Sequence, residues 1–279
     1  MIDIHLHVGR LYLEPPLRPS YLLNFMDRHG IEKAALLPME NPEQTYFYVT
    51  TAEVLRVCRR HPDRFIPFCN VDPRRWAGDR STDFASVLNE YRERGCRGFG
   101  EGICGLPIDD PRLCAIYEIC GRLGMPVILD LTAQTNIDEQ GLPRFEKMLR
   151  DLPATVFLGH GAHFWAEISG DVTPRDFSAY PGGKVAAGGA APRLLERHPN
   201  LYGDLSANSG YNALTRDPEF GYRFLEAFQG KLILGTDLCH AGQQAPIIPY
   251  LKDALAQGRI SRAAFDQITR TNAERILGL

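Results

Sequence analysis

The sequence predicts an α/β fold, a single (β/α)8 TIM barrel over residues 1–279. Three observations predict it: short apolar runs alternate with segments of helical spacing, glycine follows several of those segments, and the alternation occurs eight times. An open, doubly wound sheet is the alternative. That fold favours a glycine-rich turn after its first strand, and residues 7–10 (His-Val-Gly-Arg) do not supply one.

Apolar and β-branched runs mark the eight expected strands. They are residues 2–8, 31–38, 65–71, 96–102, 126–131, 155–160, 201–206 and 232–237. Segments with the apolar spacing of helices lie between and after them. They are residues 21–29, 51–61, 83–94, 111–123, 142–149, 193–198, 246–257 and 261–277. Gly30, Gly95, Gly124 and Gly230 stand where helices should end, because glycine readily adopts the left-handed conformation of a helix C-terminus.

One connection is much longer than the others. Residues 161–192 follow the sixth strand as a run of about thirty residues, whereas such loops usually have about two to six. Loops that follow strands gather at the carboxyl end of a barrel, where active sites form. We therefore expect this loop beside the site, either as a mobile cover or as a surface excursion.

Composition excludes several classes of protein. The chain has 31 basic and 34 acidic residues, a net charge of −3, which gives no support for binding nucleic acid. It contains no run of 18 apolar residues and no basic leader, so we expect a soluble, cytoplasmic protein without membrane contact. Its seven cysteines are odd in number and show no C-x-x-C spacing, which predicts reduced thiols.

The first strand alternates between apolar and polar residues. Ile2, Ile4, Leu6 and Val8 share one face, and Asp3, His5 and His7 share the other. We expect the apolar face to pack on helices and both histidines to point into the barrel near the carboxyl end of the strand. A buried, unsatisfied imidazole nitrogen costs on the order of 1 to 3 kcal/mol. A divalent metal ion would satisfy both rings at once.

Other predicted strands also end in polar residues. They are Glu101, Asp130, His160, Asp204, Ser206 and Asp237. So much charge inside a barrel is costly unless it is paired or coordinated, so the set predicts a metal site together with the two histidines of the first strand. Glu101 and Asp130 could instead hold the second nitrogen of a histidine, and His160 could be an ordinary buried histidine.

Several residues near these strand ends are candidates for contact with a small-molecule substrate. Arg10 could pair with Glu14 at the surface, or it could bind a substrate carboxylate through its planar guanidinium group. The other candidates follow the sixth, seventh and eighth strands. The full candidate set is Arg10, His163, Trp165, Asn208, Tyr211 and His240, of which Trp165 could equally be a packing residue.

The chain resembles the amidohydrolase superfamily, in particular the amidohydrolase family 2 branch, over nearly its whole length. The resemblance rests on Asp-Ile-His-Leu-His at 3–7, Gly-Phe-Gly-Glu at 98–101, Leu-Gly-His-Gly at 158–161, Leu-Gly-Thr-Asp at 234–237 and the closing Asn-Ala-Glu-Arg-Ile-Leu-Gly-Leu at 272–279. It implies a metal-dependent hydrolase barrel in which His5, His7 and Asp237 bind a divalent ion. His160 would bind a second ion or the substrate, and Glu101 looks like the bridging carboxylate of the TatD-like branch.

One position departs from the family pattern. Asp130 ends the fifth strand, where these families usually carry histidine. The number of ions, one or two, therefore stays open, and Asp130 could ligate a second ion with Glu101 and His160. Zinc is the ion that the resemblance favours, and additional oxygen ligands would shift the preference toward manganese or magnesium.

The resemblance implies hydrolysis of a small polar lactone, ester or amide by metal-activated water, with Asp237 as proton carrier. The polar candidates Arg10, His163 and His240 favour lactones of sugars or carboxylic acids. Three alternatives remain: a non-oxidative decarboxylase of an aromatic or unsaturated carboxylic acid, a TatD-like phosphoesterase, and a barrel that binds without turnover. The decarboxylases generally use the strand-five histidine that is missing here. A homo-oligomer is also expected from the resemblance.

Overall fold

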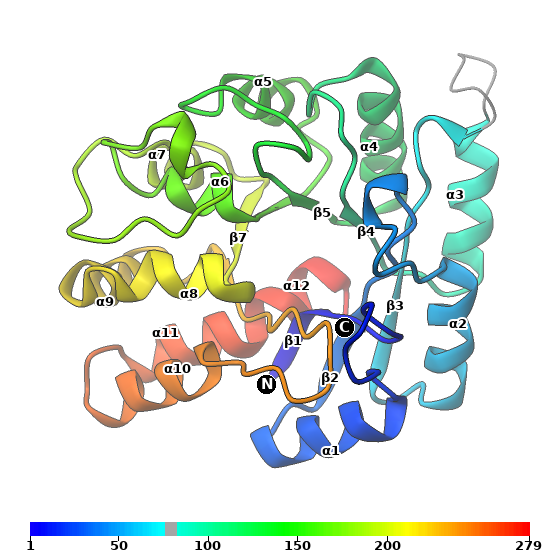
Figure 1. Cartoon of the computed structure of the whole chain (residues 1–279), viewed down its shortest axis with the longest axis horizontal. Coiled ribbons are helices and arrows are strands. Elements are labelled where there is room, and N and C mark those ends of the chain that lie inside the picture. Colours follow the sequence, from blue (N-terminus) through cyan, green and yellow to red (C-terminus); the bar gives the residue numbers. More distant parts are fainter. Residues whose placement is uncertain (76–82) are drawn as a thin grey trace.

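The computed structural model describes residues 1–75 and 83–279, and the described residues form a barrel of eight parallel strands in sequence order (Figure 1). The strands are β1 Ile2–Leu6, β2 Lys33–Leu36, β3 Phe65–Cys69, β4 Gly98–Gly102, β5 Val127–Asp130, β6 Phe157–His160, β7 Leu201–Asp204 and β8 Leu232–Ile233. Backbone bonds from Ile4 N to Leu234 O (2.9 Å) and from Asp237 N to His5 O (2.8 Å) join the last strand segment to β1. The predicted TIM barrel is confirmed.

Helices connect the strands and surround the barrel (Figure 1). They are α1 Pro19–His29, α2 Thr51–Arg60, α3 Phe84–Glu93, α4 Pro111–Leu123, α5 Pro143–Asp151, α6 Ala162–Ala166, α7 Ala190–Arg197, α8 Ala207–Thr215, α9 Pro218–Ala227, α10 Ile247–Ala256, α11 Arg262–Asp266 and α12 Asn272–Leu277. Local signals fix their ends: Thr50 and Glu53 form a capping box at α2, and Gly30 and Gly124 adopt the left-handed conformation after α1 and α4. None of the described helices is long and apolar enough to cross a membrane.

Three segments differ from the sequence prediction. The expected loop 161–192 contains helix α6 and a 3-10 turn, Pro174–Asp176, before α7 begins at Ala190. Helices α8 and α9 lie between β7 and β8, where no helix was predicted. The expected closing helix 261–277 is interrupted by a π-helical segment, Gln267–Thr271, between α11 and α12.

Two clusters of buried apolar side chains stabilise the barrel. One lies between the strands and the surrounding helices and includes Leu6, Val127 and Leu232. The other fills the barrel itself. Its members include Ile2, Ile4, Leu37, Phe68, Ile128, Leu158, Tyr202 and Ile233, with Ala273 and Leu277 of α12.

The expectation that the four apolar residues of the predicted first strand, 2–8, all pack on the surrounding helices is wrong. Leu6 and Val8 contact the outer cluster, but Ile2 and Ile4 belong to the cluster inside the barrel. The cause is a register shift: Asp3 pairs with Ala34, and Leu6 pairs with Leu36, so β1 contains one extra residue between those two pairs. This bulge allows Ile4 to fill the interior while the next residue, a histidine, still reaches the site.

Candidate active site

His5 of β1 and His7, which directly follows this strand, are fully buried, and their Nδ1 atoms face acceptors. His5 Nδ1 lies 2.7 Å from Asp204 Oδ2, and His7 Nδ1 lies 3.0 Å from the backbone oxygen of Leu37. A carbonyl oxygen only accepts, so the Nδ1 of His7 carries the proton and donates. The two Nε2 atoms, 3.1 Å apart, are therefore left to bind a third partner.

Two carboxylates complete a group of four potential metal ligands. Glu101 Oε2 lies 3.3 Å from His5 Nε2 and 3.4 Å from His7 Nε2. Asp237 Oδ1 lies 3.6 Å and 3.1 Å from the same two nitrogen atoms. An ion bound tetrahedrally at about 2.0 to 2.1 Å holds its ligand atoms about 3.3 Å apart, so this spacing fits one divalent cation. The donor set of two imidazoles and two carboxylates suits such an ion.

The electrostatics of the group favour positive charge. Burial lowers the pKa of His5, but the carboxylates of Glu101, Asp237 and Asp204 outweigh burial and raise that pKa well above its ordinary value. Burial raises the pKa of Glu101, but the facing histidines hold it well below its usual range. The cluster therefore attracts positive charge, as protons on the imidazoles or as a cation between them.

Asp237 reaches the site through an unusual backbone conformation. Its φ is 53°, in the left-handed region that non-glycine residues rarely adopt, and its amide donates to His5 O. The preceding Thr236 is held by the buried Asp3, which accepts from its amide (3.0 Å) and from its hydroxyl (2.6 Å). Burial raises the pKa of Asp3 to about 7. The Leu-Gly-Thr-Asp segment is thus fastened directly to the His-x-His strand.

Gly235 in this segment meets a steric requirement. A Cβ atom at this position would lie 2.5 Å from Asp204 Oδ1 and 3.0 Å from His5 Cβ. Because both neighbours belong to the site, no larger residue fits without displacing them. The motif therefore requires glycine where the segment after β8 packs closely against Asp204 of β7 and His5 of β1.

A second group of potential ligands shares Glu101 with the first. It comprises Glu101, Asp130 and His160, whose ligand atoms lie within 4.8 Å of one another. His160 Nε2 lies 3.4 Å from Glu101 Oε1, the carboxylate oxygen that faces away from His7. Burial and the charge of Glu101 raise the pKa of Asp130 to about 7. The arrangement could hold a second cation, and Asp130 occupies the place where the family usually has histidine.

Asp204 orients two of the imidazoles. Its Oδ2 accepts from His5 Nδ1 at 2.7 Å, lies 3.3 Å from His160 Nδ1 and accepts from Ser206 Oγ at 2.9 Å. Burial raises the pKa of Asp204, but the two histidines outweigh burial and hold it below its usual range. Sequence reasoning placed Asp204 among the polar strand ends without giving it this role. Its position in β7 could have indicated this role. Asp204 lies two residues after Tyr202, so both side chains are on the interior face of the strand.

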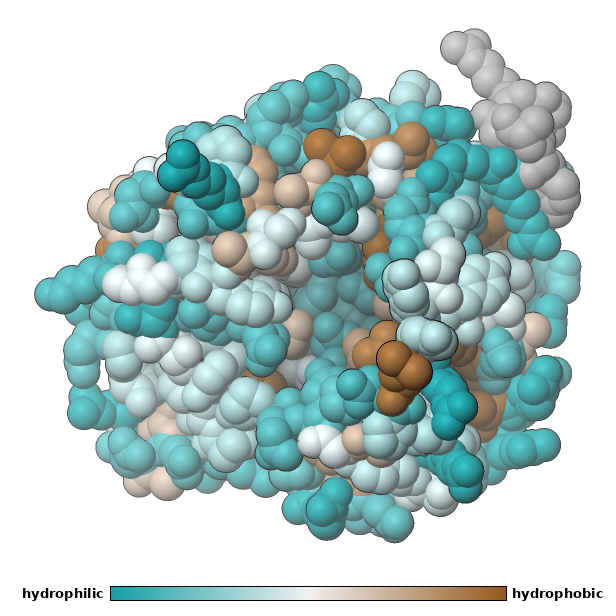
Figure 2. Space-filling view, in the orientation of Figure 1, coloured by the Kyte–Doolittle hydropathy of each residue, from teal (hydrophilic) through white to brown (hydrophobic). Residues whose placement is uncertain are grey.

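A cavity of about 230 Å³ opens beside these groups at the carboxyl ends of the strands. Figure 2 shows a hollow near the centre of this face, with mainly hydrophilic residues inside it. The described residues that line the cavity are Met39, Glu101, Ile103, Asp130, Thr132, His160, Gly161, Ala162, Tyr180, Ala207, Ser209, Asp237 and Cys239. Tyr180 belongs to the long 161–192 connection, so that connection borders the cavity as expected.

The structure places three predicted substrate residues outside the cavity lining. Arg10 is exposed and lines a separate groove with Tyr48 and Val57. His240 Nδ1 lies 3.6 Å from Glu14 Oε2. Asn208 is exposed near the start of α8. Neither Arg10, His240 nor Asn208 is among the described residues that line the cavity.

Three further candidates lie within the packed part of the protein. His163 is buried and stacks on Phe177, with ring centroids 3.4 Å apart. Trp165 is 2% exposed, and its indole N–H donates to Asp204 O at 2.8 Å. Tyr211 is half-buried and packs edge-on against Tyr250. Trp165 thereby supports β7 beneath the site.

Sequence reasoning missed several cavity residues. Ser209 is 4% exposed and lines the cavity, and its Oγ has no hydrogen-bond partner among the described residues. The prediction chose its neighbours Asn208 and Tyr211 because it placed a loop after β7. With the segment folded as α8, residues on different faces of the helix point in different directions, and Ser209 lines the cavity whereas Asn208 and Tyr211 do not.

Comparisons with known proteins place this chain in a family. No curated protein matches it significantly. Solved structures that share its fold include an amidohydrolase from Burkholderia multivorans with bound zinc, with a TM-score of 0.67. Another is a probable 2-pyrone-4,6-dicarboxylic acid hydrolase from Acinetobacter baumannii with citric acid bound, with a TM-score of 0.60. Each is 16% identical to this chain, and each match covers 100% of this chain and 99% of the other. A Rhizobium 2,6-dihydroxybenzoate decarboxylase (0.61, 16% identical) covers 99% of this chain and 97% of its own. The family model described as Amidohydrolase matches residues 2–279, and the chain therefore belongs to the amidohydrolase family.

Proposed function

We propose that this protein is a metal-dependent hydrolase that cleaves a small lactone, ester or amide. The observation that carries the proposal is the set of four ligand atoms of His5, His7, Glu101 and Asp237. The histidine nitrogens lie 3.1 to 3.6 Å from the carboxylate oxygens and from each other. Hydrogen bonds from Nδ1 orient both imidazoles: His5 bonds to Asp204, and His7 bonds to the backbone oxygen of Leu37. The two rings can therefore hold a cation without rearrangement.

These residues would hold a zinc or manganese ion, since imidazole and carboxylate ligands suit both. When bound, such an ion supplies a water of lowered pKa, from about 15.7 toward 7, and polarises a carbonyl group. His160 could hold a second ion with Glu101 and Asp130, or it could contact the substrate. Its Nδ1 faces Ser206 Oγ at 3.0 Å, which leaves its Nε2 toward the cavity.

Asp237 is the proposed proton carrier. Its Oδ1 faces His5 and His7, whereas its Oδ2 lies 3.9 Å from His160 Nε2. Its side chain is 17% exposed where it borders the cavity. In hydrolysis, the oxygen of water forms a bond to the acyl carbon and the acyl–oxygen or acyl–nitrogen bond breaks. Asp237 takes one proton from the water and delivers it to the leaving atom, so the products are an acid and an alcohol or amine.

Decarboxylation is the second candidate, since a decarboxylase shares the fold. The family resemblance associates that reaction with a histidine at the end of the fifth strand. This chain has Asp130 there, with Oδ2 accepting from Thr135 Oγ1 at 3.0 Å. A carboxylate at this position favours hydrolysis over decarboxylation.

The test is a substrate screen on protein reconstituted with zinc or with manganese. Lactones, aryl carboxylates and phosphodiesters are supplied in parallel, and product formed in water enriched in oxygen-18 is analysed by mass spectrometry. We expect lactone opening with one labelled oxygen in the acid product. Release of carbon dioxide from aryl carboxylates without lactone opening would replace the proposal by decarboxylation. Failure of all three classes with both metals would overturn an enzymatic function of this type.

A further inference from the structure

Beside Glu101, a buried asparagine replaces the regular pairing of strands. The pairing of β3 with β4 ends at Cys69 and Phe99, two residues before Glu101. Asn70 directly follows β3, and its Nδ2 donates to the backbone oxygen of Glu101 at 2.7 Å. The backbone of Asn70 is itself held, because its amide donates to Thr51 Oγ1 at 3.1 Å. One side chain thus fixes the carbonyl group of the residue whose carboxylate both groups of potential metal ligands share.

A second asparagine, Asn41, holds the residue that follows β4. Its Oδ1 accepts from the amide of Ile103 at 3.0 Å and from Asn70 Nδ2 at 3.1 Å. Both asparagines are buried, so water does not compete for these bonds. The bonded pair therefore clamps the backbone on both sides of Gly102, at the carbonyl of Glu101 and at the amide of Ile103.

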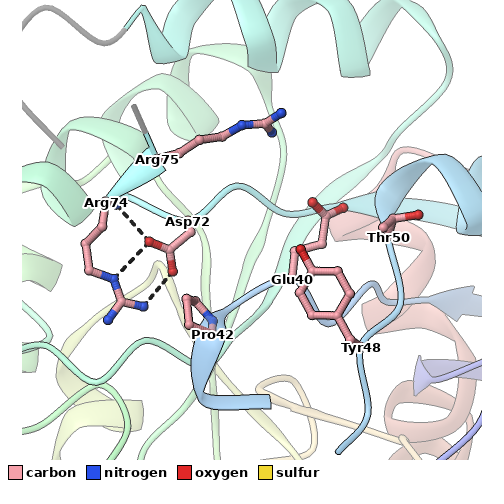
Figure 3. Close-up of a pocket in the computed structure, with 7 residues that line it drawn as sticks. All are labelled: Glu40, Pro42, Tyr48, Thr50, Asp72, Arg74 and Arg75. Atoms are coloured by element: carbon pink, nitrogen blue, oxygen red, sulfur yellow. Dashed lines mark hydrogen bonds and ion pairs between the residues drawn. The ribbon is translucent and has the colours of Figure 1, made fainter. Parts of the chain in front are cut away.

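The direction of these bonds is set at the outer end of the network. Asn41 Nδ2 donates to Asp72 Oδ2 at 2.8 Å. Figure 3 shows the guanidinium group of Arg74 against Asp72, and Arg74 donates to both carboxylate oxygens, at 2.9 and 2.6 Å. An ionised carboxylate only accepts and a backbone amide only donates, so the side-chain amide of Asn41 has a single orientation. Its oxygen therefore faces Asn70, whose Nδ2 donates its other hydrogen to Glu101.

A third asparagine joins the ends of β4 and β5. Asn136 is fully buried, and its Nδ2 donates to the backbone oxygens of Gly102 at 2.5 Å and of Asp130 at 2.8 Å. Its φ is 42°, in the left-handed region, which asparagine adopts more readily than most residues. One NH2 group thus ties together the two strand ends that carry Glu101 and Asp130.

We propose that three buried asparagines are positioning residues for the Glu101 carboxylate, namely Asn41, Asn70 and Asn136. Glu101 Oε2 lies 3.3 Å from His5 Nε2, and Glu101 Oε1 lies 3.4 Å from His160 Nε2. Because each oxygen meets a different imidazole, a small rotation of the backbone would break one contact or both. The asparagines act only through Glu101. This inference rests on the metal site of the proposed function and deepens it.

Zinc binding, measured by calorimetry on protein freed of metal, tests the inference. Asn70→Leu keeps the approximate shape of the side chain and removes the donor to Glu101. Loss of a group that orients a metal ligand lowers metal affinity about 10- to 100-fold, so we expect the dissociation constant for zinc to rise at least tenfold. An unchanged dissociation constant in a folded variant would overturn the inference.

Asn200→Leu is the matched control. Asn200 is 6% exposed and directly precedes β7, at the opposite end of the strands from the site. Its Nδ2 also donates to backbone oxygens, those of Leu149, Leu152 and Thr155. We expect this variant to melt at a lower temperature than the wild type and to bind zinc within twofold of it. Equal losses of zinc affinity in both leucine variants would show only general destabilisation and would overturn the positioning role.

A double-mutant cycle tests whether Asn70 acts through Glu101. In a Glu101→Ala background the asparagine has no carboxylate left to position, so Asn70→Leu should change the dissociation constant for zinc by less than twofold. A further loss as large as in the wild-type background would place the effect elsewhere and contradict the inference.

Asn41→Ala is the milder variant, because the bond from Asn70 to Glu101 remains. We expect a rise of about two- to fivefold in the dissociation constant for zinc, the effect of a single neutral hydrogen bond. Circular dichroism checks that each variant folds. If neither Asn70→Leu nor Asn41→Ala folds while Asn200→Leu does, the asparagines serve the fold, and the positioning role is overturned.

Lactone turnover of the wild type is measured separately from zinc binding. A wild type that binds zinc, shows the expected pattern of variants and opens no lactone overturns the proposed hydrolysis and supports the positioning role. A wild type that opens lactones and whose variants keep their zinc affinity overturns the positioning role alone. Absence of zinc and manganese binding in the wild type would overturn both.

Discussion

The two layers of the barrel interior differ in chemistry although the same strands build them. Toward the amino ends the strands contribute Ile128, Leu158 and Tyr202, which belong to the apolar cluster that fills the barrel. Two residues further along the same strands come Asp130, His160 and Asp204. Because side chains two apart share one face of a strand, both sets point inward. A step of two residues therefore separates a layer that stabilises the fold from a layer that carries ionisable groups.

The polar layer depends on the rest of the protein for its stability. Buried charges do not stabilise a fold by themselves, since removing them from water costs more than their attraction returns. The apolar layer beneath supplies burial, and the polar layer is held by internal partners such as Asp204 and Asp3. Substitutions in the two layers should therefore change different properties. A substitution in the apolar layer should lower stability, and one in the polar layer should weaken metal binding and turnover.

Metal removal should give the largest effect. Treatment with a chelator should reduce turnover to background, and addition of zinc or manganese should restore it, because His5, His7, Glu101 and Asp237 lose their shared cation. The melting temperature, followed by circular dichroism, should rise by several degrees on reloading, since ligand at about 100 times its dissociation constant stabilises by about 2.7 kcal/mol. A metal-free preparation that turns over unimpaired would break the distinction between the layers.

Asp237→Asn should come next. Asparagine keeps an oxygen near the histidines but cannot accept a proton, so turnover should fall by about 10²- to 10⁴-fold. The melting temperature of the metal-loaded variant should stay close to that of the wild type. Steady-state kinetics and a thermal melt check both parts. Full activity in this variant would contradict the proton-carrier role.

Ile128→Ala tests the apolar layer. It removes a fully buried side chain, so the free energy of unfolding should fall by about 2 to 5 kcal/mol. Zinc binding and turnover per folded molecule should change little. Denaturant titration gives the stability. Ile137→Ala is the control, because Ile137 is 38% exposed and its truncation should change stability by about 0.5 kcal/mol or less.

Arg10→Ala should have the smallest effect. Arg10 is exposed in its own groove, so we expect the KM of neutral substrates and of anionic substrates to change by less than about twofold. An increase confined to anionic substrates would instead support the contact with a substrate carboxylate that the sequence allows. Kinetics with a matched pair of substrates decide between the two.

The sequence predicted the barrel well because each strand carried its own signal. Period-two alternation and the polar ends identified His5, Asp130 and His160 as residues of one interior, and glycine identified the ends of α1 and α4. The orientation of Ile4 was not predictable, since a bulge in β1 depends on pairing with β2. The periodicity within one strand gives no information on how that strand pairs with its neighbour.

The region after β7 was missed for a different reason. Helix α8 contains asparagine, serine and glycine, which have low helix propensity, so packing against the barrel rather than local preference determines it. Helix α9 did carry a signal, because Asp217 caps it and Pro218 occupies its first turn. The choice of Asn208 and Tyr211 over Ser209 followed from the missing helix.

The contact between the β8 end of the chain and β1 also determines when the site can form during synthesis. Asp3 and Thr236, which hydrogen-bond each other, are 233 positions apart in the chain. At about 5 to 20 residues per second, the ribosome releases the second roughly 10 to 50 s after the first. For most of that interval the histidines at positions 5 and 7 lack Asp204, and Asp237 follows only at its end. The candidate centre is therefore among the last parts of the molecule to assemble, and a nascent chain that stalls before β8 cannot contain it.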